Sequence, residues 1–456
     1  MQTGVFRTIK NTGLMLGGLG LFLASPAWGA DGIDPSYEGE YEGSTATSSA
    51  PADTNVDANA PKPFVEAANV GLTTDGGQAA CAAPAPACAA PAPTCAAPAN
   101  CGNGCSCGNG CGGNSGCGSC NLGEPWTLMK ALCGEEAPPF KISGWSQWGY
   151  TTESDGVLNT HPDHFDAQQQ WLYAEKIADG SNGWGYGFRA DILYGTDAQN
   201  TQAFGNPPGS WDFQNGWDHG VYGWAMPQLY GEVAKGNLSV KLGKFYTYQG
   251  YEVFPAPGNF FYSHSFTWNF NEPFTHTGFM ANYKVNDNLS VMAGWTAGLD
   301  SGFDRTDDGS NFHGGFSNKL NDKQTFTYMA CAGDFGWRGE GYLHTLILDT
   351  NINDKWQHVI HSDLVLTNID DDSQFSIVNY LFYKINDCYK LGGRAEWWLA
   401  DDESIFEITG GLNAKMSANV IVRPEIRYQW ATDDAAAAAF GIDDDFIFGI
   451  DAIITF

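Results

Sequence analysis

The stretch Trp184-Gly-Tyr-Gly-Phe-Arg-Ala-Asp-Ile-Leu-Tyr194 decides the fold, because its large apolar side chains return at every second residue. In a β-strand, successive side chains point to opposite faces, so this stretch has one aromatic, apolar face and one small or polar face. The same alternation recurs at 420–430 and at the C-terminus, where it ends on Phe456. The region from residue 140 onward is therefore predicted to be an antiparallel all-β structure.

Two architectures suit this alternation. In a soluble β-sandwich the apolar face is the core, whereas in an outer-membrane barrel it faces lipid and the polar face lines the lumen. Trp184 and Tyr194 are ten residues apart, which for a strand tilted by about 45° spans roughly 23 Å, the height of the lipid-facing band. A chain that ends on an aromatic residue within its last strand is also typical of outer-membrane proteins. These features favour a transmembrane antiparallel β-barrel.

Short and long connections alternate along residues 140–456. Short turns are expected where Asn-Asp pairs, which are typical of hairpins, separate apolar runs, at 285–288, 320–323, 352–355 and 385–388. Three more are expected near 180–183, Gly236 and Met416. Longer, often acidic loops are expected at 154–166, 197–224, 247–275, 300–311, 334–339, 368–373, 401–403 and 432–444. Together these connections join about sixteen strands, with fourteen and eighteen as alternatives. An even number places the short turns in the periplasm.

Composition excludes several classes of function. The net charge is −30, with 22 Lys and Arg against 52 Asp and Glu, which excludes a basic nucleic-acid-binding surface. No phosphate-binding loop, zinc-protease motif or nucleophile elbow occurs, so neither an enzyme nor a cofactor is expected. His358 and His361 should lie on opposite faces of a strand, and no metal site is expected. Cys331 and Cys388 are interpreted as small residues of the barrel wall.

The N-terminal third differs from the rest. Residues 1–29 are interpreted as a signal peptide, with Arg7 and Lys10 ahead of an apolar stretch and small residues before the cut. Residues 30–123 contain too few large apolar groups to fold, so a disordered periplasmic linker is expected. A short helix at 125–132 is expected in the connector 124–139. The linker cysteines are disulfide candidates, local or to other chains, with metal binding and a reactive or inert spacer as the alternatives; they are Cys81, Cys88, Cys95, Cys101, Cys105, Cys107, Cys111, Cys117 and Cys120.

The stretch 243–278 carries a resemblance to a known family. It contains Lys244-Phe-Tyr-Thr-Tyr-Gln-Gly-Tyr-Glu252 and Asn271-Glu-Pro-Phe-Thr-His276, and it resembles the signature of the OmpL-like beta-barrel porin family. The early strand Ser143-Gly-Trp-Ser-Gln-Trp-Gly-Tyr150 and the final Phe456 fit the same family. The resemblance covers about 140–456 and implies an outer-membrane barrel with a pore. It implies no catalytic or substrate-binding residue.

The loop 247–275 is the third long loop, and in sixteen-stranded general porins that loop folds into the lumen and narrows it. By this analogy we expect it to form the constriction, lined by Glu252, His264, Asn269, Glu272 and His276. The alternative is that these residues tie the loop to the barrel wall. Lumen-facing charges of both signs are also expected, as is usual for a polar lumen filled with water; they are Arg189, Asp191, Arg394, Glu396, Arg423, Glu425 and Arg427.

These observations predict an outer-membrane porin that contacts lipid and lets small hydrophilic solutes and ions diffuse passively. Acidic outer loops such as 370–372 and 443–445 should concentrate cations and give a weak cation preference. The alternative is a structural anchor with a plugged barrel, whose Cys-rich linker cross-links to other envelope components or to itself. The sequence leaves the solute and the oligomeric state open, with a homo-oligomer as one alternative.

Overall fold

The computed structural model describes residues 122–134, 138–304, 309–369, 373–400, 403–432, 437, 442 and 445–456. The predicted signal peptide, the linker up to residue 121 with its nine cysteines, and the acidic runs at 370–372 and 443–444 lie outside these residues. Within them, no helix is long and apolar enough to cross a membrane.

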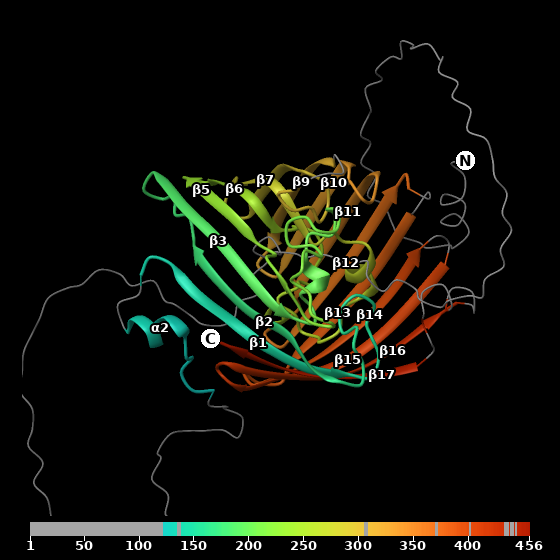
Figure 1. Ribbon diagram of the computed structural model, residues 1–456. Coiled ribbons are helices and arrows are strands. Elements are labelled where there is room, and N and C mark those ends of the chain that lie inside the picture. The colour runs from blue at the N-terminus through green and yellow to red at the C-terminus, as the bar shows by residue number, and fades with distance from the viewer. Residues whose placement is uncertain are drawn as a thin grey trace, which may run out of the picture. The chain divides into compact units, whose positions relative to one another are not determined.

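The fold is a single antiparallel sheet that closes on itself (Figure 1). Each strand pairs with its neighbours in the chain, and β1 pairs with β17, for example Trp145 with Thr455. The strands are β1 (Lys141–Thr151), β2 (Phe165–Lys176), β3 (Trp184–Gly195), β4 (Gly223–Ala225), β5 (Leu229–Lys235), β6 (Leu238–Tyr246), β7 (Thr275–Lys284), β8 (Leu289–Thr296), β9 (Ser310–Asn321), β10 (Gln324–Asp334), β11 (Glu340–Asn351), β12 (Trp356–Thr367), β13 (Ser373–Lys384), β14 (Tyr389–Ala400), β15 (Glu403–Ser417), β16 (Val420–Ala431) and β17 (Asp445–Thr455).

Two of these segments, β4 and β5, form one barrel strand. Both pair with β3, β4 at its C-terminal end and β5 at its N-terminal half. The ladder is interrupted only at 226–228, where the amide of Asp191 still donates to the carbonyl of Gln228 at 2.9 Å. Counting β4 and β5 together reduces the seventeen segments to sixteen strands, which confirms the predicted barrel.

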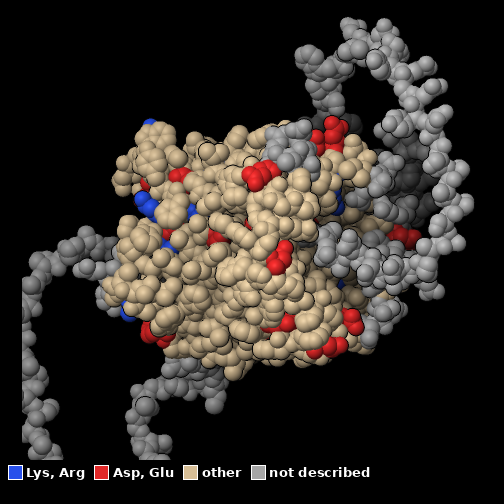
Figure 2. Space-filling view, viewed as in Figure 1, with Lys and Arg blue, Asp and Glu red and all other residues tan. Residues whose placement is uncertain are grey.

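The predicted alternation of faces is also confirmed. On β3, the side chains of Trp184 and Tyr186 are 64% and 62% exposed, whereas Asp191 is 2% exposed. Large apolar side chains are also exposed on other strands, for example Leu242 on β6, Phe312 on β9 and Ile408 on β15, and the face in Figure 2 consists mostly of uncharged residues. The outside of the sheet therefore suits lipid, and the polar side chains point inward.

The Asn-Asp turns form where the sequence places them. In the turn after β13, Asn386 Oδ1 accepts hydrogen bonds from the amides of Cys388 at 2.9 Å and Tyr389 at 3.0 Å. The turn after β7 repeats this arrangement with Asn286 as the acceptor. An asparagine side chain that caps its own turn reverses the chain in few residues, which explains why this dipeptide marks the short connections.

The segment before the barrel is docked at the short-turn end. The backbone N–H of Trp126 donates to Asn419 Oδ1, and Asn419 Nδ2 donates to the carbonyl of Trp126, both at 2.7 Å. The helix α2 (Leu128–Cys133) begins after Thr127, whose hydroxyl accepts from the amide of Lys130 at 3.3 Å. This cap explains why the helix starts later than the predicted residue 125.

Of the two cysteines interpreted as wall residues, one differs from the prediction. Cys331 is a buried free thiol on β10. Cys388 is disulfide-bonded, and its partner lies outside the described residues. The sequence alone does not show this bond, because a disulfide depends on two Cα atoms approaching within about 7 Å in the folded chain. Cys388 lies in a short turn, at the same end of the barrel as Asn419.

Candidate functional site

The connection between β6 and β7, residues 247–274, is the candidate functional site, and we call it the inner loop. It carries η2 (Ala256–Gly258) and α3 (Phe266–Phe270), and most of its side chains are buried. Phe254 and Trp268, for example, are 0% exposed and pack with 6.0 Å between ring centroids. Figure 1 shows yellow-green segments from this part of the chain crossing the interior of the barrel.

Two wall carboxylates bind the backbone of the inner loop. Glu425 accepts from the amides of Tyr262 at 2.8 Å and Ser263 at 3.0 Å. Glu396 accepts from the first two amides of α3 at 2.6 and 2.5 Å. Each carboxylate therefore satisfies two consecutive N–H groups that would otherwise be buried without a partner.

Wall arginines bind carbonyl groups of the same loop. Arg423 Nη1 donates to the carbonyls of Ala256 at 2.9 Å and Asn259 at 2.8 Å. Arg427 Nη1 donates to the carbonyl of His264 at 2.6 Å. The loop is thus held through its backbone by both signs of charge on β14 and β16.

Arg394 on β14 joins the wall to a side chain of the loop. Its guanidinium donates to Glu407 on β15 and, at 2.7 Å, to Glu252 of the inner loop. Glu252 also accepts from the amide and the hydroxyl of Ser265, at 2.8 and 2.9 Å. With these partners Glu252 is 5% exposed. These contacts agree with the alternative that Glu252 ties the loop to the barrel wall.

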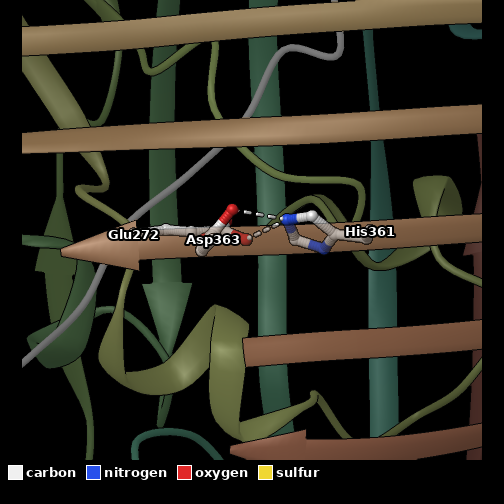
Figure 3. Close-up of side chains that lie close together, drawn as sticks. All are labelled: Glu272, His361 and Asp363. Atoms are coloured by element: carbon white, nitrogen blue, oxygen red, sulfur yellow. Dashed lines mark hydrogen bonds and ion pairs between the residues drawn. The ribbon is translucent and has the colours of Figure 1, made fainter. Parts of the chain in front are cut away.

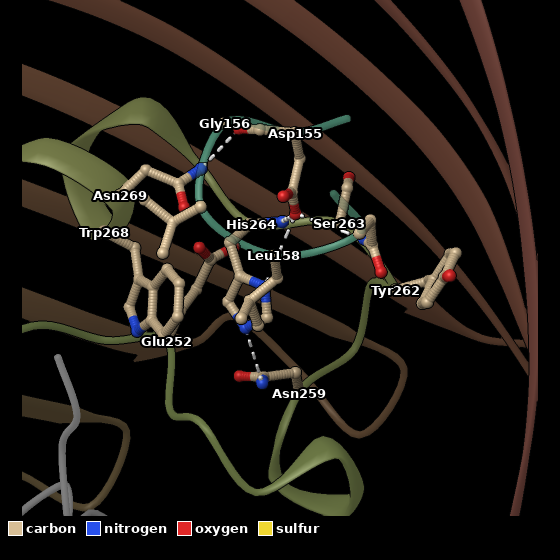
Figure 4. Close-up of polar contacts among 12 residues, drawn as sticks. Asp155, Gly156, Leu158, Glu252, Asn259, Tyr262, Ser263, His264, Trp268 and Asn269 are labelled. Atoms are coloured by element: carbon tan, nitrogen blue, oxygen red, sulfur yellow. Dashed lines mark hydrogen bonds and ion pairs between the residues drawn. The ribbon is translucent and has the colours of Figure 1, made fainter. Parts of the chain in front are cut away.

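His264 and Asn269 fasten the inner loop to the connection between β1 and β2 (Figure 4). The amide of His264 donates to Asp155 Oδ2 at 2.9 Å, and Asn269 Nδ2 donates to the carbonyl of Asp155 at 2.6 Å. The His264 ring stacks on Trp268 with 3.8 Å between centroids. A second outer loop therefore packs against the inner loop.

The other two predicted constriction residues lie near the end of the loop. His276 is the second residue of β7, is 0% exposed, and meets His313 of β9 edge to face at 4.3 Å. Glu272 is 1% exposed and its Oε1 lies 3.5 Å from His361 Nε2 of β12. Four of the five predicted residues therefore lie in the inner loop and His276 lies on β7, and all five are buried.

Six of the seven predicted lumen charges are at most 5% exposed, and Arg189 is half-buried. Arg189 pairs with Asp191, as the alternating signs suggest, and with Glu175 at 3.0 Å. Arg423 instead pairs with Asp451 of β17. These charges contact protein groups, whereas the sequence suggested a wall facing water, because the inner loop occupies the space beside them.

A family model described as "Putative beta-barrel porin-2, OmpL-like" matches residues 139–456. The chain belongs to this family. Membership confirms the resemblance carried by 243–278, and it indicates an outer-membrane barrel and a channel rather than an enzyme. No curated protein matches the chain.

Solved porins are similar to this family member in fold. A mutant of the Rh. blastica porin matches at 10% identity and a TM-score of 0.46, covering 70% of this chain and 100% of that one. The anion-selective porin from Comamonas acidovorans matches at 11% identity and a TM-score of 0.46, covering 70% and 99%. OmpT of Vibrio cholerae matches at 11% identity and a TM-score of 0.43, covering 70% and 99%.

Several residues that organise the interior of this porin-2 barrel were not predicted. Glu407 and Asp451 are the wall partners of Arg394 and Arg423. Strand alternation places both carboxylates on the inner face, so their inward position could have been predicted from the sequence. The role of Asp155 could not be predicted in this way, because Asp155 lies in a loop, where side chains do not alternate between two faces.

Proposed function

We propose that this barrel is an outer-membrane porin for passive diffusion of small hydrophilic solutes and ions, in which the inner loop narrows the lumen. Family membership supports the channel. The observation that carries the constriction is the fixation of the inner loop to β14 and β16, strands that lie far from its own β6 and β7 around the ring. A loop held at both walls restricts the cross-section open to solutes.

A weak cation preference is part of the proposal. The chain carries a net charge of −30, and several acidic runs fall in the long loops. Such a mouth raises the local concentration of cations over about 10 Å at 0.1 M salt and about 3 Å at 1 M. The preference should therefore weaken as the salt concentration rises.

Planar-bilayer conductance of the folded full-length chain tests both parts. With asymmetric KCl we expect steady steps and a reversal potential that leans toward K⁺. Replacing 253–262 by a Gly/Ser segment of equal length should raise the conductance several-fold, whereas the same replacement in 432–441 should not. A reversal potential that leans toward Cl⁻ rejects the cation preference, and unchanged conductance in the first variant rejects the constriction.

The second candidate is a structural anchor whose Cys-rich segment links the barrel to other envelope components. Trp126, just after the Cys-rich segment, is hydrogen-bonded to Asn419 at the short-turn end. Cys388 at the same end forms a disulfide within the chain, so a link to other envelope components would use other cysteines. Non-reducing gels of outer membranes, with a Cys388→Ser variant as control, would show linked species. A barrel that inserts and never conducts, together with such species, would favour the anchor.

A further inference from the structure

Three buried side chains meet where the inner loop reaches the wall (Figure 3). His361 and Asp363 lie two apart on β12 and so share its inner face, and Glu272 comes from the end of the inner loop. His361 Nε2 lies 2.9 Å from Asp363 Oδ1 and 3.5 Å from Glu272 Oε1. Among the described residues, these are the three His, Cys, Asp or Glu side chains whose ligand atoms all lie within 4.8 Å of one another, close enough to share a metal ion.

The group is shielded from solvent, because all three side chains are 0% exposed. Two carboxylates and one imidazole are ligand types that a divalent cation binds. His361 is flanked in register by Ile347 and Val378, which are 4% and 0% exposed, so apolar neighbours shield that side from water.

Two buried polar atoms at the cluster have no hydrogen-bond partner among the described residues. One is Asp363 Oδ2, and the other is the hydroxyl of Thr345, which is paired with Asp363 across β11 and β12. The other oxygen of this fully buried carboxylate, Oδ1, lies 2.9 Å from His361 Nε2. Unsatisfied buried oxygens are rare in folded proteins, and a bound ion with a water molecule would satisfy both.

The backbone around Glu272 is fixed so that its carboxylate stays beside His361. Asn271 donates to Ser376 Oγ at 3.1 Å and accepts from Trp398 Nε1 at 2.8 Å. Gly250, at φ +88°, passes directly over the carboxylate, and a Cβ there would lie 2.1 Å from Glu272 Oε2. Arg338 donates to the carbonyls of residues 270 and 271, just before Glu272.

We propose that Glu272, His361 and Asp363 bind a first-row divalent transition-metal ion, with Zn²⁺ as the reference, which fastens the inner loop to the barrel wall. One imidazole and two carboxylates suit such an ion better than Ca²⁺ or Mg²⁺, which prefer oxygen ligands alone. Ligand atoms of a tetrahedral zinc lie roughly 3.3 Å apart; here the two distances from His361 Nε2 are 2.9 and 3.5 Å, and all three ligand atoms lie within 4.8 Å of one another. Three protein ligands leave the fourth position for water.

Metal stoichiometry of the full-length protein tests the site. The protein in detergent is treated with a chelator, its thiols are alkylated so that the many cysteines bind no metal, and it is loaded with Zn²⁺ and desalted. We expect about one Zn²⁺ per chain. His361→Gln and Asp363→Asn should each weaken binding at least roughly tenfold, and Co²⁺ should give a visible d–d absorption in the wild type that these variants lose.

Asp349→Asn is the matched control. Asp349 is also a partly buried inward carboxylate on β11, but it is bound by Gln357 at 3.0 Å, away from the cluster. This variant should keep the wild-type stoichiometry, and heat-modified gel mobility shows whether each variant is folded. A wild type that retains no Zn²⁺, or folded His361→Gln and Asp363→Asn variants that bind as much as the wild type, overturns the proposal.

Discussion

Replacing Arg394 by Met should strongly destabilise the barrel. Arg394 is 1% exposed and is the ion-pair partner of Glu252 in the inner loop and of Glu407 in the wall. Methionine fills much of the same volume but leaves buried Glu252 without its arginine, and it leaves Glu407 with only Arg427, whose Nε lies 3.7 Å from Glu407 Oε2. Removing one partner of a buried ion pair costs about 3–5 kcal/mol. The carbonyl and hydroxyl of Ser263 lose donors as well, so the upper part of that range is expected.

The assay is reversible urea unfolding of the protein in lipid vesicles, followed by tryptophan fluorescence. The single variant is compared with the triple variant Arg394→Met, Glu252→Gln, Glu407→Gln, in which no carboxylate is left uncompensated. The triple variant should recover part of the lost free energy of unfolding, because the penalty comes from the unpaired charges and not from lost packing, although Arg427 then loses its ion pair with Glu407.

Two outcomes would refute the role assigned to Arg394. If Arg394→Met loses less than about 1 kcal/mol, the range of an exposed ion pair, Arg394 does not hold the inner loop as described. If the triple variant is less stable than the single one, the charges are not the source of the loss.

Two further predictions concern the inner loop and its neighbour. Gly250→Ala should cost about 1–3 kcal/mol, because Gly250 has φ +88° and no room for a Cβ, whereas Gly231→Ala, where nothing lies within 4 Å, serves as the control; equal unfolding free energies for the two variants would contradict this. Burial raises the pKa of Asp197, in the loop after β3, to about 7. A carboxyl with a raised folded-state pKa stabilises the fold at low pH and loses that contribution between about pH 4 and 7, at most ~4 kcal/mol. Asp197→Asn should flatten the dependence of unfolding on pH in this window, and a persistent slope would show that other groups cause it.

Local sequence patterns were enough to predict the barrel. Alternation along β3 and the Asn-Asp turns depend on residues close in the chain, so strand number and connection lengths could be read directly. The interruption between β4 and β5 had no such local signal. Pairing partners inside the barrel were not predictable either: alternation places Arg423 on the inner face but does not say that it contacts Asp451 and the backbone of the inner loop.

The group of Glu272, His361 and Asp363 was likewise not predictable from local sequence patterns. The sequence analysis compared His361 with His358 and found opposite faces, while Asp363, two residues on, shares the inner face of His361. The third member, Glu272, is 89 residues earlier in the chain. Only the path of the inner loop across the barrel brings it there.

The route of the inner loop bears on the order in which the barrel forms. The loop leaves the sheet between β6 and β7, but its hydrogen-bond partners lie on β14 and β16, which follow more than a hundred residues later. Until β1 meets β17, both outer strands have unpaired backbone groups that can join another chain. Contacts of such long sequence separation form slowly. Once formed, the bonds to the late strands hold the two halves of the sheet together, and we expect them to limit the reopening of these edges.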